Sequence, residues 1–100
     1  MNNEIIQNEK IVYDLTNNII LSHNTKFKEK GIAFRVELNT LQNDPYESKI
    51  IIDLIYDEEI VDFIEFSVYQ NGELIKDAET FKLWFIETLN RTYQDLTQYD

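Results

Sequence analysis

The sequence predicts a small single domain of the α+β class, in which an antiparallel β-meander packs against an N-terminal and a C-terminal helix. Apolar residues recur at helical spacing near both ends of the chain. Between these ends, three segments alternate apolar and polar residues, as half-buried strands do. The links between these segments are short, and short links make consecutive strands neighbours in a sheet. The expected order is α-β-β-β-(β)-α within one acidic domain that spans residues 1–100.

The first predicted element is a helix from about Asn3 to Leu21. The polar triplet Ser22-His23-Asn24 is expected to end it. Three of the nine basic residues follow in the segment 25–30, which we interpret as a solvated loop or a helix end. The apolar side chains of this helix fall near one stripe, formed by Ile5, Val12, Leu15 and Ile19.

Three strands follow, and their even-numbered residues are mostly apolar. The strands are predicted from Ile32 to about Asn39, from Lys49 to Tyr56 and from Ile60 to Tyr69. The segment 42–46 contains Asn, Asp and Pro, which predict a turn between the first two strands. The even-numbered face of the sheet is therefore expected to form the core, under at least the C-terminal helix.

The pairing of the second and third strands follows from the side-chain pattern. Pairing Ile52 with Ile64 keeps the apolar faces together, whereas a shift by one residue would place Ile52 beside Glu65. This pairing requires a loop of odd length, most simply Asp57-Glu58-Glu59.

The strongest local signal is Asn71-Gly72, which favours a two-residue type I′ turn. This turn would pair Tyr69 with Leu74 and begin a short edge strand over residues 73–76. Asp77 is then an N-cap for a second helix that ends at about Leu96. The stripe of this helix is expected to pack in the core, and it consists of Phe81, Trp84, Phe85, Leu89, Tyr93 and Leu96.

The net charge of the chain is −10, from 19 acidic and 9 basic residues. Phosphate groups are bound by Lys and Arg, so this charge argues against nucleic acid as a direct partner. It argues equally against an anionic membrane surface. A basic protein is the expected partner, because complementary fields speed encounter and reject wrong partners. The alternative is that the acidic excess only keeps a small protein soluble. The oligomeric state is left open.

No motif in the sequence names a reaction. Two isolated glycines cannot form a phosphate-binding loop. One histidine and no cysteine leave only carboxylates as metal ligands, and the segment 57–62 lacks the glycine of a calcium loop. We therefore expect no enzyme activity, no cofactor and no metal. With no signal-peptide pattern at the start of the sequence and no apolar run of about 20 residues, a cytoplasmic location is expected.

Six acidic residues fall within residues 53–65, and no Lys or Arg interrupts them. On the odd-numbered face of the same hairpin, apolar residues alternate with carboxylates. In one interpretation the N-terminal helix covers this face and makes it a second core layer. In the other, Phe63 and Tyr69 are aromatic anchors within an acidic rim, as at protein-binding surfaces. The candidate partner-binding residues are Asp53, Asp57, Glu58, Glu59, Asp62, Phe63, Glu65 and Tyr69.

In size, acidity and element order the chain resembles small acidic phage inhibitors of CRISPR or restriction enzymes. The resemblance implies a non-enzymatic inhibitor whose carboxylates replace phosphates in the basic nucleic-acid groove of a nuclease or defence complex. An immunity protein that neutralises a basic toxin nuclease is an alternative. A prophage or adaptor protein whose acidity only confers solubility is another. Double-stranded-RNA-binding modules share the element order, but their phosphate contacts require a basic face.

Overall fold

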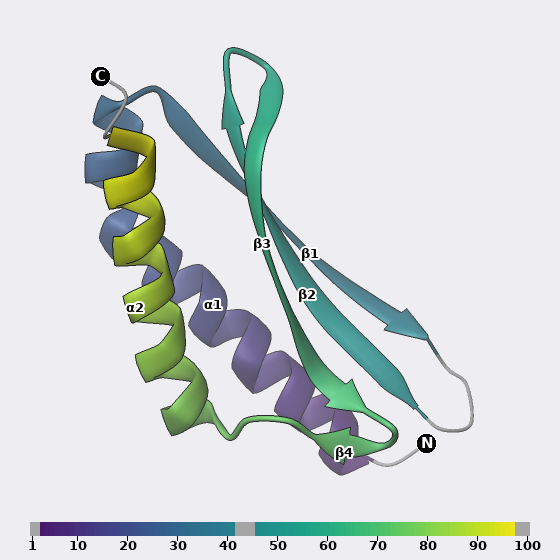
Figure 1. The fold of residues 1–100 in the computed structure, drawn as a ribbon. Helices are drawn as coiled ribbons and strands as arrows, with labels where there is room; N and C mark the ends of the chain where they lie inside the picture. The colour runs from purple at the N-terminus through teal and green to yellow at the C-terminus, as the bar shows by residue number, and fades with distance from the viewer. Residues whose placement is uncertain (1–2, 42–45, 98–100) are drawn as a thin grey trace.

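Two helices and a four-stranded antiparallel sheet form the fold (Figure 1). The computed structural model describes residues 3–41 and 46–97. The strands are neighbours in chain order, so the sheet is a meander, and the predicted α+β class and element order are confirmed. Residues 42–45 of the predicted turn lie outside the described residues. The elements are α1 (Asn3–Glu29), β1 (Ile32–Leu41), β2 (Glu47–Tyr56), β3 (Glu59–Gln70), β4 (Glu73–Leu74) and α2 (Ala78–Thr97).

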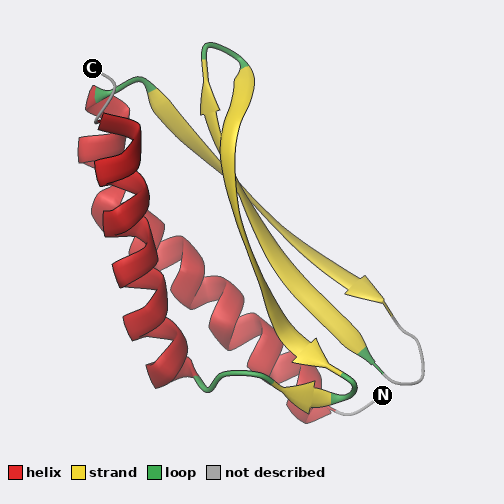
Figure 2. Ribbon diagram, viewed as in Figure 1, coloured by secondary structure: helices red, strands yellow, loops and turns green. Residues whose placement is uncertain are grey.

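Both helices pack against the same face of the sheet (Figure 2). Phe27 of α1 meets Phe34 of β1 edge-on, with 4.8 Å between ring centroids. On the other side of the same layer, Phe81 of α2 lies 4.6 Å from Phe66 of β3. The even-numbered face is therefore the core, as predicted. The interpretation in which the N-terminal helix covers the odd-numbered face is wrong.

Helix α1 continues to Glu29, beyond its predicted end. Ser22 does not stop the helix, because its hydroxyl donates to the carbonyl of Ile19 at 2.7 Å and leaves the helical backbone intact. Phe27 is fully buried, so the additional turns are held by the core. The helix ends at Gly31, which has a φ of 78° and donates its N–H to the carbonyl of Lys28.

Helix α2 begins as predicted. The Asp77 carboxylate accepts the backbone N–H of Thr80 at 2.8 Å, which makes Asp77 the N-cap. Hydrogen bonds from Thr80 to the charged carboxylate, chiefly from its backbone N–H, lower the pKa of Asp77. From the predicted aromatic stripe, Phe81, Phe85 and Leu89 are almost completely buried in the core. None of the helices in the described part of the chain has the length and apolar character needed to cross a bilayer.

The β2–β3 and β3–β4 hairpins differ in how well they were predicted. The Asn71-Gly72 turn is confirmed, because Tyr69 pairs with Leu74 and both turn residues have positive φ. In the β2–β3 hairpin the predicted pair Ile52 and Ile64 is confirmed. The predicted three-residue loop is wrong, because Tyr56 pairs with Glu59 and only two residues form the turn.

Two β-bulges in the β2–β3 pair explain this difference. The register shifts once between Leu54 and Ile55 and again between Ser48 and Lys49. At each shift, β3 carries one extra residue. The side-chain pattern required an odd number of residues between the two paired segments. The bulge near the turn supplies the extra residue within β3, so the turn itself contains only two residues.

Candidate protein-binding site at the β2–β3 hairpin

The hairpin of β2 and β3 extends past the helices at one end of the molecule, where its turn is exposed (Figure 1). The turn residues Asp57 and Glu58 have φ angles of 52° and 68°. A left-handed backbone costs most L-residues about 1–2 kcal/mol, and it is usually taken by Gly, Asn or Asp in such turns, so the strain falls on Glu58. The end of this hairpin therefore combines a strained backbone with two carboxylates.

Four acidic residues gather at this end of the hairpin, which we call the acidic tip: Asp57, Glu58, Glu59 and Asp62. All four are exposed, and within the described residues none of them forms an ion pair. The Asp62 carboxylate accepts the backbone N–H of the next residue, Phe63, at 2.8 Å. Charges of one sign at close range create a local negative potential that attracts cations.

The other two acids of the predicted cluster are neutralised by neighbours across the sheet. Arg35 of β1 donates to Asp53 through Nη2 at 2.8 Å and through Nε at 3.3 Å. Lys49 of β2 donates to Glu65 of β3 at 3.1 Å. Asp53 and Glu65 thus belong to ion pairs in the middle of the open face. Of the six acids in the cluster, only the four at the tip form no ion pair among the described residues.

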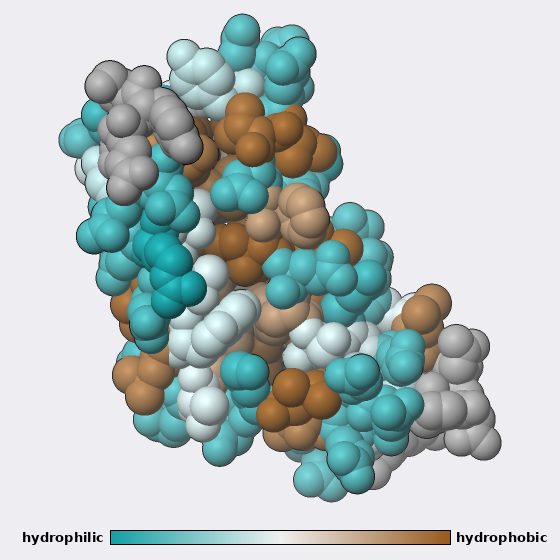
Figure 3. Space-filling view, viewed as in Figure 1, coloured by the Kyte–Doolittle hydropathy of each residue, from teal (hydrophilic) through white to brown (hydrophobic). Residues whose placement is uncertain are grey.

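Large apolar side chains are exposed beside the acidic tip. Phe63 is 59% exposed on the open face of the sheet, and Tyr56 is 53% exposed on the opposite face, where it lines a hollow with Lys30 and Val61. Ile60 and Val61 are also about half exposed. The register predicted from the Ile52–Ile64 pair places Val61 opposite Ile55, but the bulge sets Ile60 there. Figure 3 shows an apolar patch directly below the hydrophilic end of this hairpin. Apolar side chains bordered by charged ones are the usual composition of a protein-binding surface.

Tyr69 does not belong to this site, and its prediction as an aromatic anchor is wrong. It is 5% exposed and packs in the core. Its hydroxyl accepts a hydrogen bond from the Asn8 amide of α1 at 2.9 Å, and its ring meets Tyr46 edge-on at 5.9 Å. The bulge at Ser48 adds one residue before Tyr69, and this turns its side chain from the open face to the helix-covered face.

A buried acidic residue, Glu9, lies in the core near Tyr69 and Tyr46. Glu9 of α1 is 6% exposed, and its carboxylate accepts the hydroxyl proton of Tyr46 at 2.7 Å. Burial, and then the hydrogen bond to this carboxylate, raise the pKa of Tyr46. This pair links α1 to the start of β2 and lies away from the tip.

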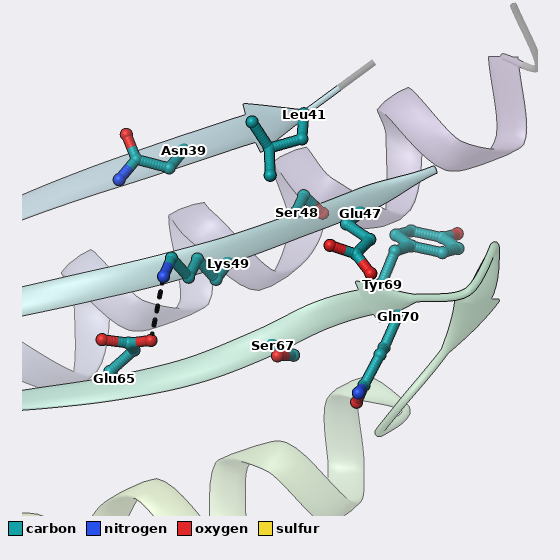
Figure 4. A pocket seen from close by; sticks show the side chains of 9 residues that line it. All are labelled: Asn39, Leu41, Glu47, Ser48, Lys49, Glu65, Ser67, Tyr69 and Gln70. Atoms are coloured by element: carbon teal, nitrogen blue, oxygen red, sulfur yellow. Dashed lines mark hydrogen bonds and ion pairs between the residues drawn. The ribbon is translucent and has the colours of Figure 1, made fainter. Parts of the chain in front are cut away.

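The open face of the sheet also contains a shallow pocket of about 200 Å³ (Figure 4). The Lys49–Glu65 ion pair lies on one side of it, and Ser67 and Gln70 line another. Small-molecule sites are usually about 300–1,000 Å³ and mainly apolar, so this pocket does not fit a substrate site. Within residues 3–41 and 46–97, no group of acidic or histidine side chains is arranged to hold a metal ion.

Sequence reasoning missed Tyr56 and Ile60 as parts of the site. Both flank the turn, and their exposure follows from the two-residue turn and the bulge beside it. Comparison of the chain with protein-family models, with curated proteins and with solved structures finds no match.

Proposed function

We propose that this protein is a non-enzymatic inhibitor that binds a basic, nucleic-acid-binding surface of a nuclease or a nucleic-acid-targeting defence complex. The observation that carries the proposal is the acidic tip. Glu58 occupies a strained left-handed position beside Asp57, and Glu59 and Asp62 add charge next to them, with no ion pair to any of the four among the described residues. No ion pair within the described residues offsets the repulsion between these four charges, whereas a basic partner would make the arrangement favourable.

The tip carries carboxylates in place of the phosphates that the partner normally binds. Lysine and arginine side chains in a nucleic-acid groove form charge-assisted hydrogen bonds to either group. The long-range attraction speeds association, and it weakens as salt screens it. The exposed ring of Phe63, on the open face beside the tip, supplies apolar contacts that slow dissociation.

A charge-reversal experiment tests this proposal. The variant E58K/E59K/D62K changes three residues of the acidic tip and raises the net charge from −10 to −4, since each reversal adds two positive units. The matched control D14K/E29K/D95K makes the same change in net charge at exposed helical positions. Loss of function in the first variant alone therefore reports on the location of the charge.

The tagged protein and both variants are used to capture partners from a lysate of the source cells, identified by mass spectrometry. We expect the unmodified protein and the control to retain a nucleic-acid-processing complex and to inhibit its activity. The tip variant should lose both properties, and added DNA or guide RNA should compete with the unmodified protein. Equal inhibition by the tip variant would contradict the proposal. Capture of a lone small toxin would replace it with an immunity function.

A further inference from the structure

The sheet has two open edges, and they differ in charge. On the outer side of β3, residues 59–67 have no neighbouring strand among the described residues, and this segment carries Glu59, Asp62 and Glu65 without a basic residue. The Asp62 carboxylate also takes the N–H of Phe63 on this edge. Charged side chains and bulges of this kind prevent edge-to-edge pairing. Two β3 edges would therefore repel each other.

The edge formed by β1 has no bulge and no net charge. Its ten residues pair with β2 in unbroken register, and its other side has no neighbouring strand in the described chain. It contains no proline, and its charged residues are Arg35 and Glu37, which sum to zero. Phe34, Val36 and Leu38 are half-buried beside it. A long, neutral edge of this kind is a template for another strand.

The hydrogen-bond pattern of the sheet shows which residues of β1 have backbone groups on the open side. The N–H of Phe63 is bonded to the Asp62 carboxylate, so it points away from β2. Phe63 lies opposite Asp53, and opposite residues in an antiparallel pair exchange either both backbone bonds or none. Asp53 therefore exchanges its bonds with Arg35 of β1. Alternation along β1 then turns the N–H and C=O groups of its even-numbered residues toward the open edge.

Charge selects one register for the pairing of β1 with a second copy of itself. Outward-pointing residues must face each other, so even-numbered residues lie opposite even-numbered ones. Two such antiparallel registers share the longest overlap within residues 32–41. One places Glu37 opposite Glu37 of the second copy, where like charges repel. The other places Val36 opposite Val36 of the second copy, and it sets each Arg35 opposite a Glu37.

We propose that two copies of this chain associate antiparallel through β1, about a two-fold axis at Val36, and join their sheets into one. About ten backbone hydrogen bonds would form across the new pair. Nε and Nη2 of Arg35 donate to Asp53, and Nη1 is left to donate to Glu37 of the second copy. Phe34 meets Leu38 of the second copy on the helix-facing side. This inference does not depend on the proposed function.

Sedimentation velocity between about 1 and 100 µM protein tests the dimer, because association depends on concentration. We expect the unmodified protein to sediment at twice its 12.0 kDa mass. E37R should sediment as a monomer, because it sets arginines against each other across the axis. R35E should do the same with glutamates. An equimolar mixture of E37R and R35E should form a dimer, since each copy supplies the charge that the other lacks.

R35E also removes the ion pair between Arg35 and Asp53. If R35E does not fold, the double variant R35E/D53R is used in its place, because it restores an ion pair within the protomer. Three results would overturn the proposal. The unmodified protein could remain monomeric over the whole range, or E37R could remain dimeric. The third is a mixture of the two reversed variants that stays monomeric, because it would show that Arg35 and Glu37 do not meet across the axis.

Discussion

The β2–β3 and β3–β4 turns have nearly the same φ angles and different chemistry. At the β3–β4 turn, Asn71 and Gly72 have φ angles of 54° and 76° and are the residues that a type I′ turn favours. At the β2–β3 turn, Asp57 and Glu58 adopt 52° and 68°. Glutamate has a Cβ that makes this conformation unfavourable, whereas glycine has none. The same shape is therefore reached at low cost in one turn and under strain in the other.

The surroundings of the two turns differ in the same way. The β3–β4 turn lies between buried Tyr69 and the Asp77 cap of α2, so each side of it serves the fold. The β2–β3 turn lies at an exposed end, with exposed apolar side chains and with acids that form no ion pair within residues 3–41 and 46–97. Local choices that disagree with the fold are expected at functional sites. This contrast is why we place the proposed partner at the acidic tip.

The largest expected effect separates two aromatic residues that the sequence assigned to one surface. Tyr69→Ala should lower the free energy of unfolding by about 3 kcal/mol, because it leaves a cavity and removes the partner of the Asn8 amide. Phe63→Thr, at an exposed strand position, should change it by less than about 1 kcal/mol. Urea unfolding followed by circular dichroism measures both. Similar losses in the two variants would mean that the open face is also part of the core.

A turn exchange should give the next largest effect. D57N/E58G places the favoured Asn-Gly pair at the β2–β3 turn, and we expect it to raise the free energy of unfolding by about 1–2 kcal/mol. The same variant should bind the partner more weakly, because two of the four tip charges are lost. Denaturant unfolding and partner capture measure the two properties. A variant that is less stable than the unmodified protein would contradict the strain assigned to Glu58.

Alanine substitutions at the second position of each turn give a matched comparison. Gly72→Ala should cost about 1 kcal/mol, because its φ of 76° is unfavourable for alanine although no atom lies near the new Cβ. Glu58→Ala should leave stability almost unchanged, since one L-residue replaces another at the same φ. Thermal unfolding of both proteins provides the test. Equal losses would show that the side chain of Glu58 itself stabilises the turn.

The smallest effect concerns Asp77, an acid that serves the fold. Its pKa is lowered by the hydrogen bonds from the start of α2, so the unfolded chain binds a proton more readily than the folded one. The resulting stabilisation is complete above the ordinary value of 3.8 and is lost as the pH falls through the lower folded value. Asp77→Asn keeps a capping side chain without this titration. Unfolding curves of the two proteins should therefore converge as the pH falls below 3.8.

Features with local causes were predictable from the sequence. The alternating strands, the Asn71-Gly72 turn and the Asp77 cap depend on residues close together in the chain. The bulges do not, because Val61 and Val68 are ordinary strand residues and nothing beside them marks an extra position. That is why Tyr69 was assigned to the wrong face.

The candidate site divides in the same way. The acids at the turn were predictable, because an unpaired charge stays at the surface in any fold. The neutralisation of Asp53 and Glu65 was not, since it depends on which residues lie opposite them across the sheet. The end of α1 was missed for a similar reason, because burial of Phe27 holds the last turns of the helix.

The most direct test of the central claim compares the inhibition constants of E58K/E59K/D62K and D14K/E29K/D95K against the captured nucleic-acid-processing enzyme. We expect the tip variant to inhibit at least about 100-fold more weakly than the control, while both remain folded. Equal inhibition constants for the two folded variants would contradict it, because charge alone and not its position at the tip would then govern binding.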